Sequence, residues 1–219
     1  MADEIDPASH RTGRRTPVLA DGIHFGEGPR WRDGRLWFSD FQAHAVKSCS
    51  LAGDCRIEFT IDDQPSGLGW LPDGSMLIVA QHKRQVLRRT ADGTITVHAD
   101  LTGVADWHCN DMVVDAAGRA YVGNFGFDLN GTIAAKGPEG MLADHPLGKL
   151  ARVDPDGAIS IAAEGMDFAN GTVITPDGRT LIIGESLGGR LTAFDIAADG
   201  SLSNRRVWAD IRPRHPDGI

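Results

Sequence analysis

The sequence repeats one short pattern four times: a small or polar residue, a mostly apolar run, a Gly-containing turn and a second apolar run. The turn glycines are Gly34, Gly74, Gly118 and Gly178, which lie 40, 44 and 60 residues apart. Two apolar runs joined by a tight glycine turn predict a β-hairpin. Repeats of this length with strands in every unit are typical of a β-propeller rather than a β-sandwich.

Each unit continues into a second, outer hairpin. The outer hairpins are expected at residues 45–60, 86–98, 150–162 and 191–208. Their turns fall at residues 52–54, 91–93, 155–157 and 198–200, and each turn contains Gly next to Asp. Four strands in a unit correspond to one propeller blade. The sequence therefore predicts an all-β chain with four complete blades.

The two ends of the sequence depart from the repeat. Residues 1–15 are polar and predict a mobile tail, so the propeller domain is expected to span residues 16–219. Residues 16–20 predict one short strand without a hairpin partner nearby. Asp217 occupies the position that opens a fifth unit. It is not part of an inner turn, because the proline-containing residues 212–216 cannot form the apolar strand that precedes such a turn. The sequence thus predicts a propeller truncated after about four blades, with its C-terminal blades missing.

The wide spacing of the third unit comes from a polar, Gly-rich insertion at residues 125–148. Long insertions in propellers lie on one face and often cover a site. The insertion is therefore either a lid over that site or a loop without a functional role.

Charge and hydrophobicity exclude some classes of function. The chain has 30 acidic and 22 basic residues and a formal net charge of −8, which argues against a nucleic-acid surface. No apolar run approaches the ~18 residues of a membrane span. The acidic start also lacks the apolar core of a signal peptide. We therefore expect no nucleic-acid or membrane partner and a cytoplasmic location.

The three cysteines do not have the spacing of a metal site. Cys49 and Cys55 can face each other across a turn at Gly53, but reduced thiols are the favoured interpretation for an intracellular chain. Cys109 lies beside Asn110 on the opposite face of an extended strand, and we interpret it as a packing residue.

The residues that open the units occupy equivalent positions in the repeat: Glu27, Ser66, Asn110, Asn170 and Asp217. Taken singly, each is most often a cap, turn or surface residue. Repeats place equivalent positions around one axis, so these side chains are expected to converge. Two carboxylates, two carboxamides and a hydroxyl are suitable ligands for Ca²⁺ or Mg²⁺ and tolerate Mn²⁺ or Zn²⁺. Without a cation, two converging carboxylates would repel and one would stay protonated.

Several motifs together resemble the SMP-30/gluconolactonase/LRE-like family, which includes regucalcin. They are Glu27-Gly-Pro-Arg-Trp, Asn110-Asp, Asn170-Gly with a following Thr-Pro-Asp-Gly, and Pro216-Asp-Gly. The resemblance runs from about residue 18 to the end of the chain. It implies a six-bladed β-propeller that binds one divalent cation, most often Ca²⁺, on its axis and hydrolyses lactones, typically sugar lactones.

The resemblance also implies roles for individual residues. Glu27, Asn170 and Asp217 match the metal ligands, and Asp217 also matches the general acid/base. Asn110 matches a residue that binds substrate near the metal.

Two further substrate-binding positions depart from the family pattern. His108 stands where sugar-lactonase members often carry Arg, and Asp128 lies in an insertion that is built differently. These differences concern the choice of substrate rather than the metal.

The expected function is metal-dependent hydrolysis of a small-molecule lactone, with gluconolactonase-like chemistry. The chain has no Gly-x-Ser-x-Gly elbow, which disfavours a serine esterase. Two alternatives stay open, because a propeller fold does not determine activity. One is a non-catalytic metal-binding scaffold, and the other is a related hydrolase of esters or phosphotriesters.

Overall fold

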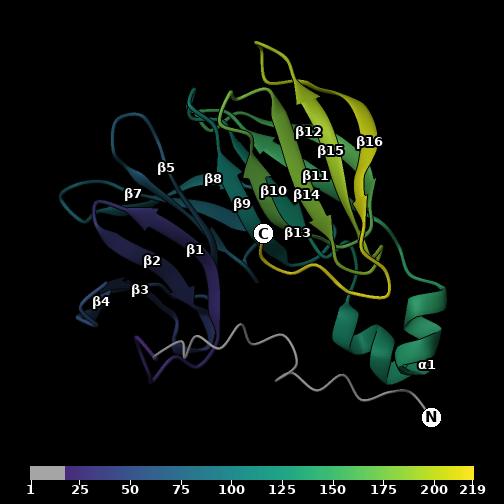
Figure 1. The fold of residues 1–219 in the computed structure, drawn as a ribbon, viewed down its shortest axis with the longest axis horizontal. Helices are drawn as coiled ribbons and strands as arrows, with labels where there is room; N and C mark the ends of the chain where they lie inside the picture. The colour runs from purple at the N-terminus through teal and green to yellow at the C-terminus, as the bar shows by residue number, and fades with distance from the viewer. Residues whose placement is uncertain (1–17) are drawn as a thin grey trace, which may run out of the picture.

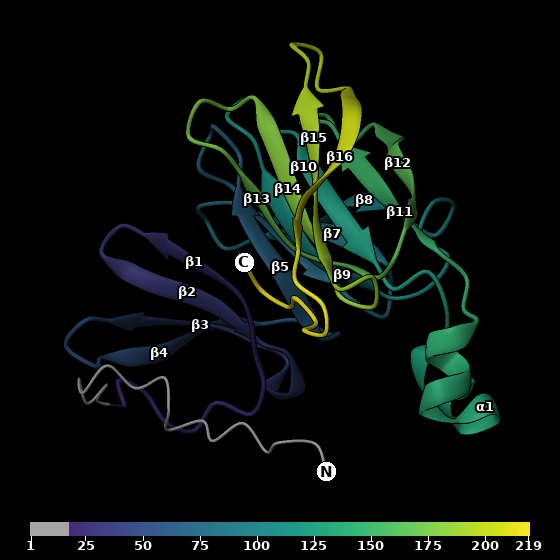
Figure 2. The same cartoon turned by 45° about the vertical axis from the view of Figure 1, so that its right-hand side comes forward.

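The computed structural model describes residues 18–219, in which four antiparallel sheets of four strands each lie side by side (Figures 1 and 2). Blade 1 contains β1 (Gly26–Arg32), β2 (Arg35–Asp40), β3 (Ala45–Ser50) and β4 (Cys55–Thr60). Blade 2 contains β5 (Pro65–Trp70), β6 (Met76–Ala80), β7 (Gln85–Arg89) and β8 (Ile95–Asp100). Blade 3 contains β9 (Cys109–Val114), β10 (Ala120–Asn124), β11 (Gly148–Val153) and β12 (Ile159–Met166). Blade 4 contains β13 (Ala169–Ile174), β14 (Thr180–Glu185), β15 (Arg190–Ile196) and β16 (Leu202–Asp210).

Each sheet follows the order of the chain, and every neighbouring pair of strands is antiparallel. The predicted inner and outer hairpins of all four units are therefore confirmed. The inner turns need a backbone with positive φ, as at Gly34 (φ 76°) and Gly74 (φ 84°), which glycine adopts without steric cost. In both views the C-terminal end of the described chain lies between blade 1 and blade 4 (Figures 1 and 2).

The apolar core lies between successive blades rather than within any one of them. Leu68 and Ile78 of blade 2 pack with Val46 of blade 1. Tyr121 of blade 3 is fully buried against blade 4, where its hydroxyl donates to the carbonyl oxygen of Gly200 at 2.8 Å. A blade can bury both of its faces only when it has neighbours, so adjacent blades stabilise one another.

The insertion of the third unit forms a helix, α1 (Leu129–Ala143), which projects from the sheets in both views (Figures 1 and 2). Its glycines and Pro138 disfavour a helix, which is why the sequence indicated only a polar loop or lid. The helix is kinked at Gly137, where φ is 72°. Asp128 caps its N-terminus by accepting a hydrogen bond from the Gly131 amide at 2.9 Å.

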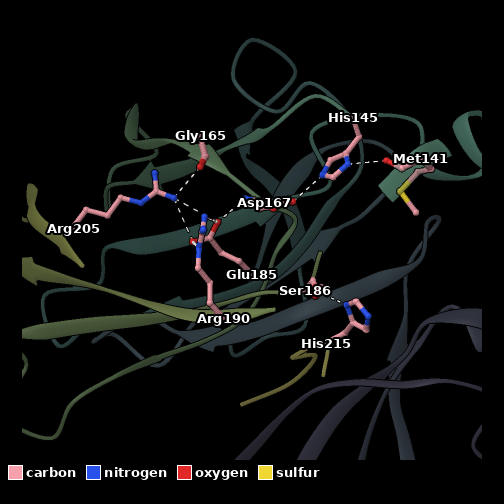
Figure 3. Close-up of polar contacts among 9 residues, drawn as sticks. All are labelled: Met141, His145, Gly165, Asp167, Glu185, Ser186, Arg190, Arg205 and His215. Carbon is pink, nitrogen blue, oxygen red and sulfur yellow. Dashed lines mark hydrogen bonds and ion pairs between the residues drawn. The ribbon is translucent and has the colours of Figure 1, made fainter. Parts of the chain in front are cut away.

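The C-terminal end of α1 is attached to blade 4 through His145 (Figure 3). One ring nitrogen of His145 lies 2.9 Å from the Met141 carbonyl oxygen, and the other lies 2.8 Å from Asp167 Oδ1. The Asp167 amide in turn donates to the buried Glu185 at 2.7 Å. Burial alone would raise the pKa of Glu185, but hydrogen bonds from Arg190 and Thr192 hold it below its usual value.

The ends of the chain and the cysteines differ in part from the expectations. Residues 18–20 are not a strand, residues 16 and 17 lie outside the described part of the chain, and so does the predicted tail at residues 1–15. The expectation of reduced thiols is wrong for Cys49 and Cys55, which form a disulfide. The pair lies directly opposite on β3 and β4, where adjacent strands bring the two side chains together. Cys109 is buried and unbonded, as its packing role requires.

Within residues 18–219 there is no helix that is long and apolar enough to span a membrane.

Candidate functional site

A cavity of about 490 Å³ lies where the innermost strands β1, β9 and β13 begin and where the C-terminal segment returns. Five of the seven predicted site residues line this cavity: Glu27, His108, Asn110, Asn170 and Asp217. These side chains come from three different blades and from the segment after blade 4. The structure therefore brings together residues that are up to 190 positions apart, from Glu27 to Asp217.

A β-bulge in each innermost hairpin helps to aim these side chains. The strand register shifts between Glu27 and Arg30 in blade 1 and between Ala169 and Thr172 in blade 4. Blades 2 and 3 have the same irregularity at the same phase. A bulge adds an unpaired residue and re-aims its side chain. The opening residues therefore sit at a local departure from regular pairing.

Asp217 is held beside blade 4 in the manner of a further innermost strand. The amide of Gly171 donates to the Asp217 carbonyl oxygen at 2.9 Å. A Cβ at Gly171 would overlap the backbone of residues 217–219. Glycine next to Asn170 is thus required for the close approach of the segment that carries Asp217.

Two rings of residues around the opening residues escaped the sequence interpretation. The first consists of residues two positions before each opening residue: Phe25, Gln64, His108 and Phe168. The second follows the second strand of each blade: Phe41, Gln81, Phe125 and Ser186. In every blade an amide of the second ring donates to a carbonyl of the first ring at 3.0–3.1 Å. All but Ser186 line the cavity.

The repeat phase already contained the signal for both rings, because their members recur at equivalent positions in every unit. Only His108 was singled out from the sequence. Much of the cavity wall is aromatic. Phe125 stacks on Phe168 with ring centroids 4.4 Å apart, and the ring centroids of His82 and His108 are 4.3 Å apart. Burial lowers the pKa of His108, and the neighbouring His82 lowers it further.

Two predicted positions lie away from the cavity. Asp128 is exposed and caps helix α1, while Asn130, two residues later, lines the cavity instead. Ser66 is fully buried and donates its hydroxyl to Asn110 Oδ1 at 3.3 Å, so it orients Asn110 rather than facing the cavity.

The carboxylate of Glu27 is repelled by two neighbouring carboxylates. The pKa of Glu27 is raised to about 7, first by burial and then by the carboxylates of Asp217 and Asp111. A divalent cation between the carboxylates would relieve this repulsion, and two carboxylates with a carboxamide are the oxygen donors that a hard cation prefers. The residues present therefore fit such a cation.

No cluster of three His, Cys, Asp or Glu side chains suited to a metal occurs in the described residues. The predicted ligand set does not need one, because Asn170 supplies its third member.

A partly buried ion pair next to the site was also missed. Arg30 donates to Asp111 Oδ1 at 3.1 Å and to the Met112 carbonyl oxygen at 2.6 Å, which joins blade 1 to blade 3. Burial raises the pKa of Asp111, and the charge of Arg30 opposes that shift. The signal lay in the repeat: Asp111 stands where the other units have Gly28, Gly67 and Gly171.

The sequence model of the SMP-30/Gluconolactonase/LRE-like region matches residues 25–219 of this chain. The chain is 26% identical over 214 residues to the pentonolactonase XacC of Haloferax volcanii, an alignment that covers 93% of this chain. The chain spans 65% of the length of that relative.

Solved structures with similar folds also match this chain. A gluconolactonase of Xanthomonas campestris is 24% identical, with a TM-score of 0.70 over 91% of this chain and 67% of that one. A calcium-binding protein, the regucalcin of Agrobacterium tumefaciens, is 22% identical, with a TM-score of 0.65 over 89% of this chain and 61% of that one. At these identities the likeness establishes the propeller fold alone.

Proposed function

Because the chain belongs to the SMP-30/gluconolactonase/LRE-like family, we propose that it is a metal-dependent hydrolase of small-molecule lactones. The observation that carries the proposal is the cavity in which Glu27, Asn110, Asn170 and Asp217 converge at one phase of the repeat. Two relatives named for the hydrolysis of sugar lactones support the substrate class.

Glu27, Asn170 and Asp217 are the proposed ligands of one divalent cation. Ca²⁺ is the first choice, because carboxylate and carboxamide oxygens are its usual protein ligands. Mg²⁺, Mn²⁺ and Zn²⁺ are the alternatives. When bound, the cation would polarise the lactone carbonyl and stabilise the negative charge that develops on its oxygen.

The remaining steps belong to side chains of the protein. Asp217 accepts a proton from the attacking water and returns it to the ring oxygen that leaves, as a general base and then a general acid. Asn110, oriented by Ser66, and His108 hold hydroxyl groups of the substrate. The lowered pKa of His108 favours a neutral imidazole at pH 7, which can both donate and accept a hydrogen bond.

Chelation and re-addition of metal test this proposal directly. The full chain is assayed on a panel of sugar lactones, simple lactones, aryl esters and phosphotriesters, before and after treatment with EDTA and after addition of Ca²⁺, Mg²⁺, Mn²⁺ or Zn²⁺. We expect lactone hydrolysis to disappear on chelation and to return with at least one cation.

The same panel separates the alternatives. Lactone hydrolysis that survives chelation, in protein with unchanged circular dichroism, contradicts the metal dependence. Binding of a cation without hydrolysis of any panel member would instead indicate a non-catalytic scaffold. Turnover of esters or phosphotriesters but not of lactones would move the proposal to a related hydrolase.

A further inference from the structure

We infer that Ser186 is a positioning residue that orients the carboxamide of Asn170 and fixes the segment that carries Asp217. In blades 1 to 3 the equivalent residues, Phe41, Gln81 and Phe125, present their side chains to the cavity. Ser186 is buried and does not line the cavity; its hydroxyl contacts Asn170 and Pro216 instead. The part of this inference that concerns a cation rests on the proposed function.

The hydroxyl of Ser186 has one proton, and its partners determine where that proton goes. Ser186 Oγ lies 2.6 Å from the Pro216 carbonyl oxygen, which can only accept a hydrogen bond. The hydroxyl proton is therefore committed to Pro216. Nδ2 of Asn170 lies 3.1 Å from the same Oγ. Asn170 must therefore be the donor of this hydrogen bond, with its NH₂ group facing Ser186.

This arrangement selects one of the two orientations of the Asn170 carboxamide. The two ends of a carboxamide are nearly alike in shape, so packing alone discriminates poorly between them. Only the orientation with the NH₂ group toward Ser186 leaves the oxygen of Asn170 free for a cation. The Ser186 hydroxyl thus converts an ambiguous side chain into a defined oxygen donor.

The backbone of Ser186 also contacts the same segment. Nδ1 of His215 lies 2.7 Å from the Ser186 carbonyl oxygen and must donate to it (Figure 3). Pro216 is buried, whereas residues 212–215 and 217–219 are exposed. Ser186 therefore contacts two consecutive residues that precede Asp217, in a segment with little other burial. Loss of its hydroxyl should loosen the segment as well as release Asn170.

Two readouts on the full chain test these two effects. The first is the rate at which trypsin cleaves the Arg214–His215 bond in EDTA, followed by mass spectrometry, because cleavage reports opening of the segment without any metal. The second is the affinity for Ca²⁺, measured by calorimetry. We expect Ser186→Ala to raise the cleavage rate roughly fivefold, the effect of one lost hydrogen bond.

We expect the same variant to weaken Ca²⁺ binding about 10–100-fold, as for other residues that orient a metal ligand. Ser186→Thr keeps a hydroxyl and should restore both values. Ser48→Ala is the matched control, because Ser48 is also buried and bonded through its hydroxyl to Arg35 and Glu58 but lies outside the cavity. Asn170→Ala should lose Ca²⁺ affinity and leave cleavage at the parent rate.

The outcomes are separable from those of the proposed function. A cleavage rate or a Ca²⁺ affinity that is unchanged in Ser186→Ala overturns the inference and leaves the proposed hydrolase standing. Equal losses in Ser186→Ala and Ser48→Ala also overturn it, since they would reflect general destabilisation. A parent protein that binds no divalent cation refutes the cation part of the proposed function, and the role assigned to Asn170 falls with it.

Discussion

The innermost strands of blades 1 and 2 have the same phase in the repeat but differ greatly in burial. Pro29 and Trp31 of β1 are exposed, Trp31 by 56%. Leu68 of β5, which is equivalent to Pro29, is fully buried. Trp70, equivalent to Trp31, packs edge-on against Trp37 with ring centroids 5.8 Å apart. The difference follows from neighbours, because β5 lies between β1 and β9.

The same comparison shows what does not depend on burial. Glu27 reaches the cavity from the exposed strand β1, just as Asn110 and Asn170 do from the buried strands β9 and β13. Strand phase and the bulge are local properties of each hairpin and direct the side chain whether or not the strand is covered. Site geometry and core packing are therefore separable in this molecule, and the following experiments test that separation.

The largest effect is expected where the site is affected and the core is not. Asp217→Asn should lower kcat for lactone hydrolysis by roughly 10²–10⁴-fold, because it removes the carboxylate that we propose transfers the proton. His108→Ala should lower kcat much less, since the role proposed for His108 is only to position the substrate. Steady-state kinetics of both variants measure the difference. Similar losses in kcat would mean that the two roles are wrongly assigned.

The next effect concerns the covered strand. Leu68→Ala should lower the free energy of unfolding by about 2–5 kcal/mol, because it opens a cavity between blades 1 and 2 where Leu68 packs with Val46 and Ile78. Urea unfolding followed by fluorescence measures the change. A cost below about 1 kcal/mol would show that the contact between these blades is looser than the burial of Leu68 indicates.

A pH-dependent effect should arise at Glu27. Its pKa is about 7 in the folded state, against the ordinary value of 4.5. The metal-free folded state therefore binds more protons than the unfolded state between these values, and stability declines as pH rises from about 4.5 to 7. Glu27→Gln should make this decline shallower, as measured by urea unfolding in EDTA at several pH values. Parallel curves for parent and variant would contradict the raised pKa.

The smallest effect is expected on the exposed strand. Trp31→Ala should change the free energy of unfolding by no more than about 0.5 kcal/mol, as is usual for surface positions. The measurement is the same urea titration used for Leu68→Ala. A loss of unfolding free energy equal to that of Leu68→Ala would contradict the contrast between β1 and β5, because it would show that β1 is covered in solution.

The sequence by itself determined the hairpins, the four blades and the phase of the opening residues. These features depend on glycine turns and on apolar runs only a few residues long, so each can be read within one unit. The prediction that Glu27, Asn110, Asn170 and Asp217 face one cavity followed from equivalence between units. It needed no knowledge of which side chains touch.

Only the tertiary structure decided the contacts that cross between units. Arg30 meets Asp111 across 81 residues, and Ser186 meets Pro216 across 30. Each outcome depends on the packing of one element against another. That packing arises when blades bury their faces against each other, and no single unit specifies it.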